Sequence, residues 1–283
     1  MKLEGRRTSE NVDDRRKISG TTAGLGIGGI IIAGLLTWMM GGNPLDVITG
    51  QLSDVTQKTT AHVPSAEEEA AADFASKILA GTEDVWTKEF EKMGRRYVPP
   101  KMVLFTRATS SGCGSASSQT GPFYCPSDQT VYIDLSFFSQ MQNKLGAGGD
   151  FAYAYVIAHE VGHHVQYLLG TLNEVYKKQK QVNKTEANHL NVRLELQADF
   201  YAGIWAYHDN KMYNSLETGD IEKGLNAANA IGDDRLQMQA QGYTVPDAFN
   251  HGTSAQRVRW LKKGATTGQV ADGNTFSPDY SSL

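Results

Sequence analysis

The feature that most constrains this chain is an H-E-x-x-H motif at residues 159–163, inside a segment with helical character. Asp150 precedes the apolar half of this segment and is the expected N-cap of the helix. Positions i and i+4 share one helix face, so His159 and His163 can direct their imidazoles at one metal ion. Glu160 lies beside the first histidine, where a carboxylate can take a proton from a metal-bound water. The motif therefore predicts two metal ligands and a general base, and the rest of the chain has to supply a third ligand.

A second long helix, expected over about 185–207, carries two carboxylates at the same spacing. Glu195 and Asp199 share a face with apolar neighbours such as Leu194, so that face is not expected to be fully solvated. Buried carboxylates without a partner are costly, so these two need a cation. We predict Glu195 as the third ligand and Asp199 as the hydrogen-bond partner of a ligand histidine. Two neutral imidazoles and one carboxylate suit a catalytic Zn²⁺ with one position left for water.

Composition excludes several other classes of protein. The pI near 6.0 and the net charge of -4 give no electrostatic footprint for nucleic acid, so no nucleic-acid partner is expected. The chain has two cysteines, Cys113 and Cys125, and no C-x-x-C pair. This excludes a cysteine zinc site and a thioredoxin-type redox motif.

The N-terminal region predicts a membrane anchor. Residues 1–22 are polar with a net charge of +2 and read as a flexible cytoplasmic tail. Residues 23–40 form an uncharged apolar run of 18 residues, near the lower limit for crossing a bilayer, and no signal-peptide cleavage site follows. We assign 23–42 to one transmembrane helix. The basic residues before it predict a cytoplasmic N-terminus and an exported C-terminal domain.

Residues 43–66 read as a linker, and the remaining 217 residues, 67–283, can form one well-buried domain. Hydrophobic periodicity predicts an α+β fold that is mainly helical with a small sheet. The expected elements are helices at 67–93 (with one break near 81–82), 137–145, 150–169, 172–182 and 218–241, strands at 102–106 and 131–135, and a final helix after a capping box of Thr253 and Gln256. The polar tail from about 264 is expected to be loosely held.

The two cysteines flank a Ser/Gly-rich loop and, in an exported domain, should form a disulfide between Cys113 and Cys125. Closing this loop would stabilise the fold by roughly 3 kcal/mol. The alternative, a reactive thiol or a metal-binding pair, is less favoured because no third ligand lies near in sequence.

The metal motifs resemble those of known proteases. H-E-x-x-H followed by E-x-x-A-D is the gluzincin pattern, and Glu195-Leu-Gln-Ala-Asp199 fits it. In the membrane-bound CAAX-type and heat-shock zinc proteases a later H-P-x-x-x-x-R segment places a histidine near the metal. His251 and Arg257 have that spacing here, with Gly252 in place of proline. The resemblance implies that His251 stabilises the oxyanion and that Arg257 is an ion-pair partner. The alternative for His251 is a loop histidine that only supports the last helix. Rival oxyanion groups are Tyr201, Tyr243 and Arg235.

A closer resemblance extends over nearly the whole chain, to the YpfJ-like bacterial neutral zinc metallopeptidases. It rests on several stretches that agree in order: 5–7, 12–16, 112–114, 121–126, 131–134, 159–164 and 232–236. The resemblance implies a single-pass protein of the bacterial inner membrane with an extracytoplasmic (periplasmic) zincin-like domain. Some members carry two further cysteines where this chain has Phe200 and Gly273, which implies that a second disulfide is missing here.

Together these features predict a zinc metalloendopeptidase that acts on a protein or peptide, with metal-bound water as nucleophile and Glu160 passing the proton to the leaving amine. Residues 131–135 are the expected strand edge along which a substrate lies, and His164 is expected to pack rather than bind metal. Two alternatives stay open. One is a non-catalytic, membrane-tethered zinc module for binding or chaperoning, against which Glu160 argues. The other is a hydrolase of a non-peptide amide such as a cell-wall bond.

Overall fold

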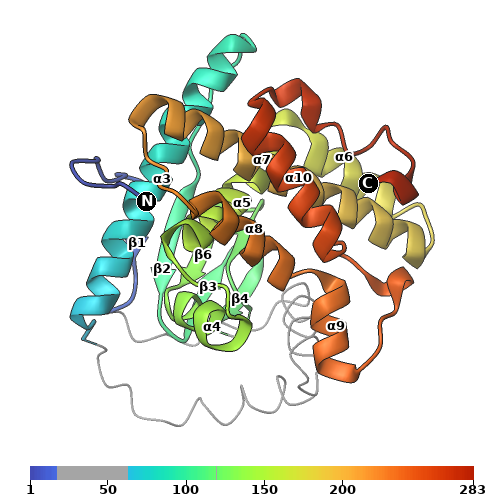
Figure 1. Cartoon of the computed structure of the whole chain (residues 1–283), viewed down its shortest axis with the longest axis horizontal. Helices are drawn as coiled ribbons and strands as arrows, with labels where there is room; N and C mark the ends of the chain where they lie inside the picture. Colours follow the sequence, from blue (N-terminus) through green and yellow to red (C-terminus); the bar gives the residue numbers. More distant parts are fainter. Residues whose placement is uncertain (18–62, 119) are drawn as a thin grey trace.

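A small sheet and a larger group of helices share one hydrophobic core (Figure 1). The computed structural model describes residues 1–17, 63–118 and 120–283. The predicted class, mainly helical α+β with a small sheet, is confirmed in these residues. None of the helices in these ranges is long and apolar enough to cross a membrane. The predicted transmembrane helix, 23–42, lies outside the described residues.

The sheet has the strand order β1-β2-β6-β5. Strands β1 (Val12–Asp14), β2 (Lys101–Phe105) and β6 (Thr130–Asp134) are parallel, and β5 (Phe123–Cys125) runs antiparallel to β6. The strands expected near 102–106 and 131–135 are therefore present. The prediction that 131–135 is an edge is wrong, because β6 pairs with β2 on one side and β5 on the other. The edge strand beside it is β5.

The two faces of the sheet are buried by different parts of the chain. Met102 and Leu104 of β2 belong to the main core with the helices, and Val103 and Phe105 face a smaller cluster on the other side. That side is covered by a hairpin of β3 (Ala108–Ser111) and β4 (Gly114–Ser117), whose Ser- and Gly-rich sequence gave no strand signal. The predicted disulfide between Cys113 and Cys125 is present and ties this hairpin to β5.

The helices follow the predicted periodicity closely. They are α3 (Ala66–Lys92), α4 (Ser136–Leu145), α5 (Asp150–Leu169), α6 (Thr171–Gln179), α7 (Lys184–Tyr213), α8 (Asp220–Ala230), α9 (Asp233–Gln241) and α10 (Ser254–Thr267). The capping box of Thr253 and Gln256 is confirmed. Asp150 is the first helical residue rather than the N-cap, which is Gly149.

The expected break in the helix 67–93 is absent. Gly81 and Thr82 are fully buried inside an uninterrupted α3, and Gly81 faces Trp205 and Asp209 of α7. The Thr82 hydroxyl donates to the Leu79 carbonyl, so its side chain is satisfied within the helix. Packing against α7 therefore outweighs the low intrinsic helix propensity of this pair.

Residues 1–17, predicted to lie in a flexible tail, instead pack against the rest of the described chain. Residues 12–14 form β1 and pair in parallel register with β2. The Arg16 guanidinium is buried and donates to Asp14, Glu69 and the Glu68 carbonyl. Arg6 donates to Asp209 at 2.7 Å, joining the first residues of the chain to α7. A run of charged residues reads as a solvated tail in sequence, but here each of these arginines has a carboxylate partner supplied by the fold.

This packing joins residues 1–17 to the rest of the described chain through a strand pair and ion pairs. The predicted orientation, with a cytoplasmic N-terminus and the domain on the opposite side of a membrane, stays a prediction.

The C-terminal tail is also held more firmly than expected. Residues 264–267 complete α10, and the Arg193 side chain bonds the Thr275 carbonyl. Arg259 donates to the carbonyls of Ser282 and Leu283. Gly273 packs directly against the Phe200 ring, so an aromatic contact fills the place where the resemblance implied a missing disulfide.

Candidate metal centre

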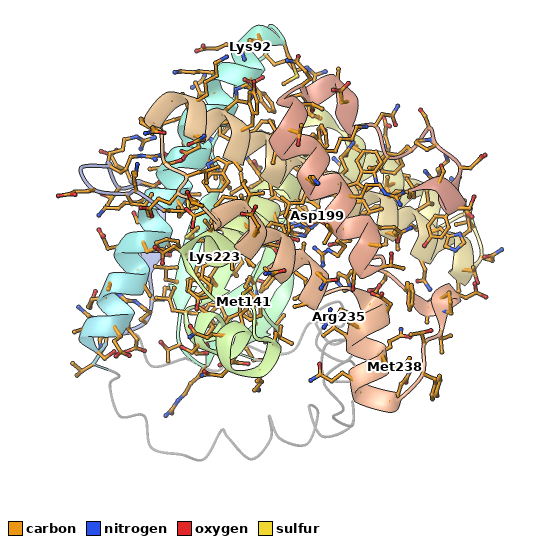
Figure 2. All side chains as sticks on the ribbon, in the orientation of Figure 1. Lys92, Met141, Asp199, Lys223, Arg235 and Met238 are labelled. Atoms are coloured by element: carbon orange, nitrogen blue, oxygen red, sulfur yellow. A yellow bond between two sulfur atoms is a disulfide. The ribbon has the colours of Figure 1, made fainter. Side chains whose placement is uncertain are left out.

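Helices α5 and α7 come together at the middle of the molecule, where Asp199 lies (Figure 2). A side chain at Gly162 would place a Cβ 3.0 Å from the Ala198 carbonyl oxygen, so the glycine permits this close approach. The approach brings the histidines of α5 opposite the carboxylates of α7.

Three side chains form the only potential metal cluster found among the described residues: His159, His163 and Glu195. Their ligand atoms lie within 4.8 Å of one another. His159 Nε2 is 3.2 Å from Glu195 Oε2, and His163 Nε2 is 3.5 Å from Glu195 Oε1. Sequence spacing thus predicted a set that the structure does bring together, across two helices.

His159 is oriented by a buried ion pair. Its Nδ1 donates to Asp199 Oδ1 at 2.8 Å, which leaves the Nε2 lone pair directed at Glu195. Asp199 also accepts from the Tyr155 hydroxyl at 2.6 Å and from the Arg257 guanidinium at 2.9 Å through two nitrogens. All four side chains are buried, so Arg257 neutralises a carboxylate that would otherwise be unpaired.

The electrostatics of the site favour a cation between the ligands. Burial alone would raise the pKa of the Glu195 carboxyl, but the two facing histidines hold that pKa well below its usual range. Burial alone would lower the pKa of His159, but Asp199 and Glu195 raise it to about 10. The Glu195 carboxylate and the two imidazole nitrogens opposite it therefore favour a positive charge in the space between them. A two-histidine, one-carboxylate donor set of this kind fits Zn²⁺.

The cluster opens into a cavity of about 580 Å³. Glu160 lines this cavity next to the ligands, and its carboxylate makes no hydrogen bond to another side chain or backbone group in the described ranges. Apolar side chains make up much of the remaining wall: Pro122, Phe123, Phe137, Met141, Leu145, Val156, Leu172, Ile231 and Leu236. Glu160 therefore faces a largely apolar space from which water can be displaced.

His251 lines the same cavity and is held by Asp233. The imidazole Nδ1 is 3.2 Å from Asp233 Oδ1, and Asp233 Oδ2 accepts the backbone N–H groups of Asn250, His251 and Gly252. Burial alone would lower the pKa of His251, but the charge of Asp233 and the hydrogen bond raise it. Asp233 was not predicted as a site residue.

The loop after His251 differs from the H-P-x-x-x-x-R pattern. Gly252 has a φ of +92°, a left-handed conformation that proline cannot adopt because its ring fixes φ near −65°. Of the rival oxyanion groups, Tyr201 borders a different cavity and the Tyr243 side chain is exposed. None of the three rivals, Tyr201, Tyr243 and Arg235, lines the metal cavity.

His164, predicted to pack, lies on a different face of α5 from the ligands. Its Nε2 is 2.7 Å from the Val98 carbonyl and its Nδ1 is 2.9 Å from the Tyr124 hydroxyl. A carbonyl only accepts, so the proton is on Nε2 and Tyr124 donates to Nδ1. Burial lowers the pKa of His164 to about 4, so the ring stays neutral and connects α5 to β5.

Sequence reasoning missed three supporting residues: Gln166, Tyr155 and Asp233. Gln166 and Tyr155 lie on α5, three residues after His163 and four before His159, so helical spacing alone could have suggested both. Asp233 approaches His251 only through the turn between α8 and α9 and the loop before α10, and no spacing in the sequence predicts that contact.

Comparison with known proteins gives a consistent result. The sequence model of one family, described as "Putative neutral zinc metallopeptidase", matches residues 1–276. "Uncharacterized protein YpfJ" of Escherichia coli (strain K12) is 51% identical over 98% of this chain and 99% of its own length. An uncharacterized protein of Mycobacterium tuberculosis (strain H37Rv) is 44% identical over 64% of each chain. No solved structure matches.

Proposed function

This chain belongs to the putative neutral zinc metallopeptidase family, and from that premise we propose that it is a zinc-dependent endopeptidase. The observation that carries the proposal is the position of Glu160, beside two histidines and a carboxylate that fit zinc and facing a cavity large enough for a peptide segment. A site that held zinc only for structure would need no base in that position.

The residues of the site have separable roles. His159, His163 and Glu195 would hold the ion, which, when bound, supplies Lewis acidity that activates water and polarises a carbonyl. Glu160 accepts the proton of the attacking water and delivers it to the leaving amine. His251, charged through its contact with Asp233, donates to the oxygen that becomes negative.

We place the peptide backbone along β5 rather than β6. Phe123 and Tyr124 of β5 line the metal cavity, and β5 is the outer strand of the sheet on that side. An outer strand offers unpaired backbone groups to which an extended peptide can add. In this arrangement the peptide would lie in the cavity that β5 and the candidate metal ligands both line, with its scissile bond facing those ligands.

The experiment that tests the proposal is cleavage of a broad peptide library by purified full-length protein. Cleavage that stops on chelation and returns on addition of Zn²⁺ supports a peptidase. Zinc binding without cleavage of any library member contradicts it and favours the binding or chaperone module. Hydrolysis only of non-peptide amides, such as cell-wall fragments offered in parallel, favours the second alternative.

The role of His251 predicts a pH effect. Replacing His251 with Ala should lower kcat by about 10²- to 10³-fold with zinc retained, because one oxyanion donor is lost. Asp233 raises the pKa of His251, so in the wild type the imidazole stays charged to higher pH. In Asp233→Asn the pKa of His251 is lower, and the imidazole loses its charge at a lower pH. The alkaline limb of the kcat–pH profile should therefore move to lower pH in Asp233→Asn.

Asp234→Asn is the matched control for this experiment. Asp234 follows Asp233 in α9 and accepts hydrogen bonds from Ser254 rather than from His251, so the alkaline limb of the Asp234→Asn profile should match that of the wild type. An equal shift in both variants, or no shift in Asp233→Asn, would contradict the assignment.

We propose that any membrane attachment leaves the two ends of the chain on the same side. The predicted anchor at 23–42 and an inner-membrane location stay predictions from the sequence. Glu4 and Lys262 are exposed, and both native cysteines are in the disulfide, so Glu4→Cys and Lys262→Cys each add a single free thiol. In intact cells, a membrane-impermeant maleimide should label both variants or neither. Labelling of only one of the two variants would contradict this proposal and support the predicted topology, in which the chain crosses the membrane once.

A further inference from the structure

The two histidine ligands are supported in different ways. His159 donates to a carboxylate, whereas Nδ1 of His163 lies 2.9 Å from the side-chain oxygen of Gln166. Gln166 is on the same helix, three residues later, and is completely buried. The orientation of the second ligand therefore depends on a neutral amide.

The surroundings of Gln166 fix which end of the amide faces the histidine. Gln166 Nε2 donates to the Leu194 carbonyl at 2.7 Å and to Gln197 Oε1 at 3.1 Å. A carbonyl oxygen only accepts, so the amide nitrogen has to face Leu194 and the amide oxygen is left for His163. His163 consequently carries its proton on Nδ1 and directs the Nε2 lone pair at the metal position.

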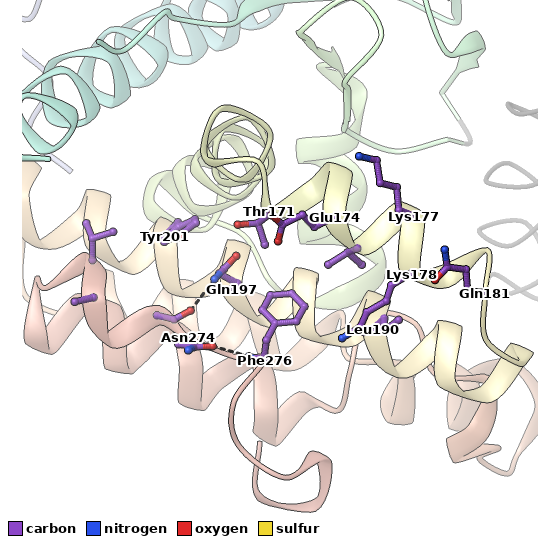
Figure 3. Close-up of a pocket in the computed structure, with 14 residues that line it drawn as sticks. Thr171, Glu174, Lys177, Lys178, Gln181, Leu190, Gln197, Tyr201, Asn274 and Phe276 are labelled. Carbon is purple, nitrogen blue, oxygen red and sulfur yellow. Dashed lines mark hydrogen bonds between the residues drawn. The ribbon is translucent and has the colours of Figure 1, made fainter. Parts of the chain in front are cut away.

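The chain of amides continues to the C-terminal segment, residues 270–276. Gln197 Nε2 donates to the Gly273 carbonyl at 2.8 Å, which in turn fixes Gln197 Oε1 toward Gln166. Gln197, Tyr201 and Asn274 border a second cavity of about 630 Å³ on this side of α7 (Figure 3). Three hydrogen bonds thus run from the metal ligand through two buried glutamines to the backbone near the end of the chain.

We propose that Gln166 and Gln197 are positioning residues for His163, and that the C-terminal segment helps to set metal affinity through the Gly273 carbonyl. Without the Gln166 oxygen, the His163 ring can rotate or take the other tautomer, which removes the lone pair from the metal. Without Gln197, the Gln166 amide keeps Leu194 but loses its second acceptor, so its hold on His163 is weaker.

The test is the zinc affinity of full-length protein, measured by competition with a chromophoric chelator. Gln166→Met should weaken zinc binding by about 10- to 100-fold, the range found when the partner of a ligand histidine is removed. Gln197→Met, one hydrogen bond further away, should weaken it by roughly 3- to 10-fold, below that range. The visible spectrum of the Co²⁺-loaded protein should change in both variants, because ligand orientation changes and not only affinity.

Gln237→Met is the matched control. Gln237 is also buried, but its side chain accepts from the Val245 backbone and is outside this chain of amides. Zinc affinity of Gln237→Met should equal that of the wild type.

Zinc affinity within twofold of wild type in Gln166→Met, or equal losses in all three variants, would overturn the proposal. If Gln166→Met does not fold, Gln197→Met decides: a several-fold loss supports the chain and an unchanged affinity overturns it. Because no substrate is involved, the result is independent of whether the protein proves to be a peptidase.

Discussion

Glu160→Gln is expected to bind zinc as the wild type does and to lose about 10²- to 10⁴-fold in kcat/KM on the peptides that the wild type cleaves. Glu160 lines the metal cavity but is not one of the three clustered ligands, so the amide removes the proton acceptor and spares the metal. The measurement is metal content of the dialysed protein together with kcat/KM on the best peptide of the library.

The control for this variant is Glu186→Gln, the same chemical change near the N-terminus of α7 and outside the cavity. It should leave both zinc content and kcat/KM unchanged. Removal of a general base should lower kcat/KM by at least about 10²-fold. If Glu160→Gln keeps more than about a tenth of the wild-type kcat/KM, Glu160 is not the general base. Loss of zinc in that variant would instead make Glu160 part of the metal-binding set.

The second large effect is expected in the N-terminal residues. Arg6 and Asp209 form a buried pair, with side chains 10% and 1% exposed. Arg6→Met leaves the Asp209 carboxylate buried with Ser215 as its remaining hydrogen-bond donor, so the free energy of unfolding should fall by about 3–5 kcal/mol. Urea unfolding in the presence of chelator measures this without a contribution from zinc.

Arg15→Met serves as the control, because the side chains of the Arg15–Asp13 pair are 33% and 49% exposed and the pair should contribute less than about 1 kcal/mol. Deletion of residues 1–17 should be more damaging still, since it removes β1 from the edge of β2 as well as Arg6 and the buried Arg16. A stable, zinc-binding protein after that deletion would show that the N-terminal strand is dispensable, and equal stabilities of Arg6→Met and Arg15→Met would contradict the role of the buried pair.

Local patterns predicted most of the helices. The i, i+4 spacing of the histidines and of the carboxylates marks α5 and α7, and a capping box marks the start of α10, because these signals act within a few residues of one another. The same local reasoning failed at Gly81 and Thr82, where burial against α7 overrides weak propensity. It also failed for the hairpin of β3 and β4, whose polar strands are stabilised by pairing and a disulfide rather than by hydrophobic alternation.

By itself, the sequence determined the positions of the candidate metal ligands and of Glu160, the proposed base. His159, Glu160 and His163 are fixed on one helix by its geometry, and buried carboxylates at helical spacing on a second helix require a cation. Only the tertiary structure decided what surrounds them. The His251–Asp233 contact, the amides behind His163, the place of β5 at the edge of the sheet and the packing of residues 1–17 all join segments far apart in the chain. Such contacts depend on how whole elements pack, and a periodicity or a spacing carries information only about neighbours along one element.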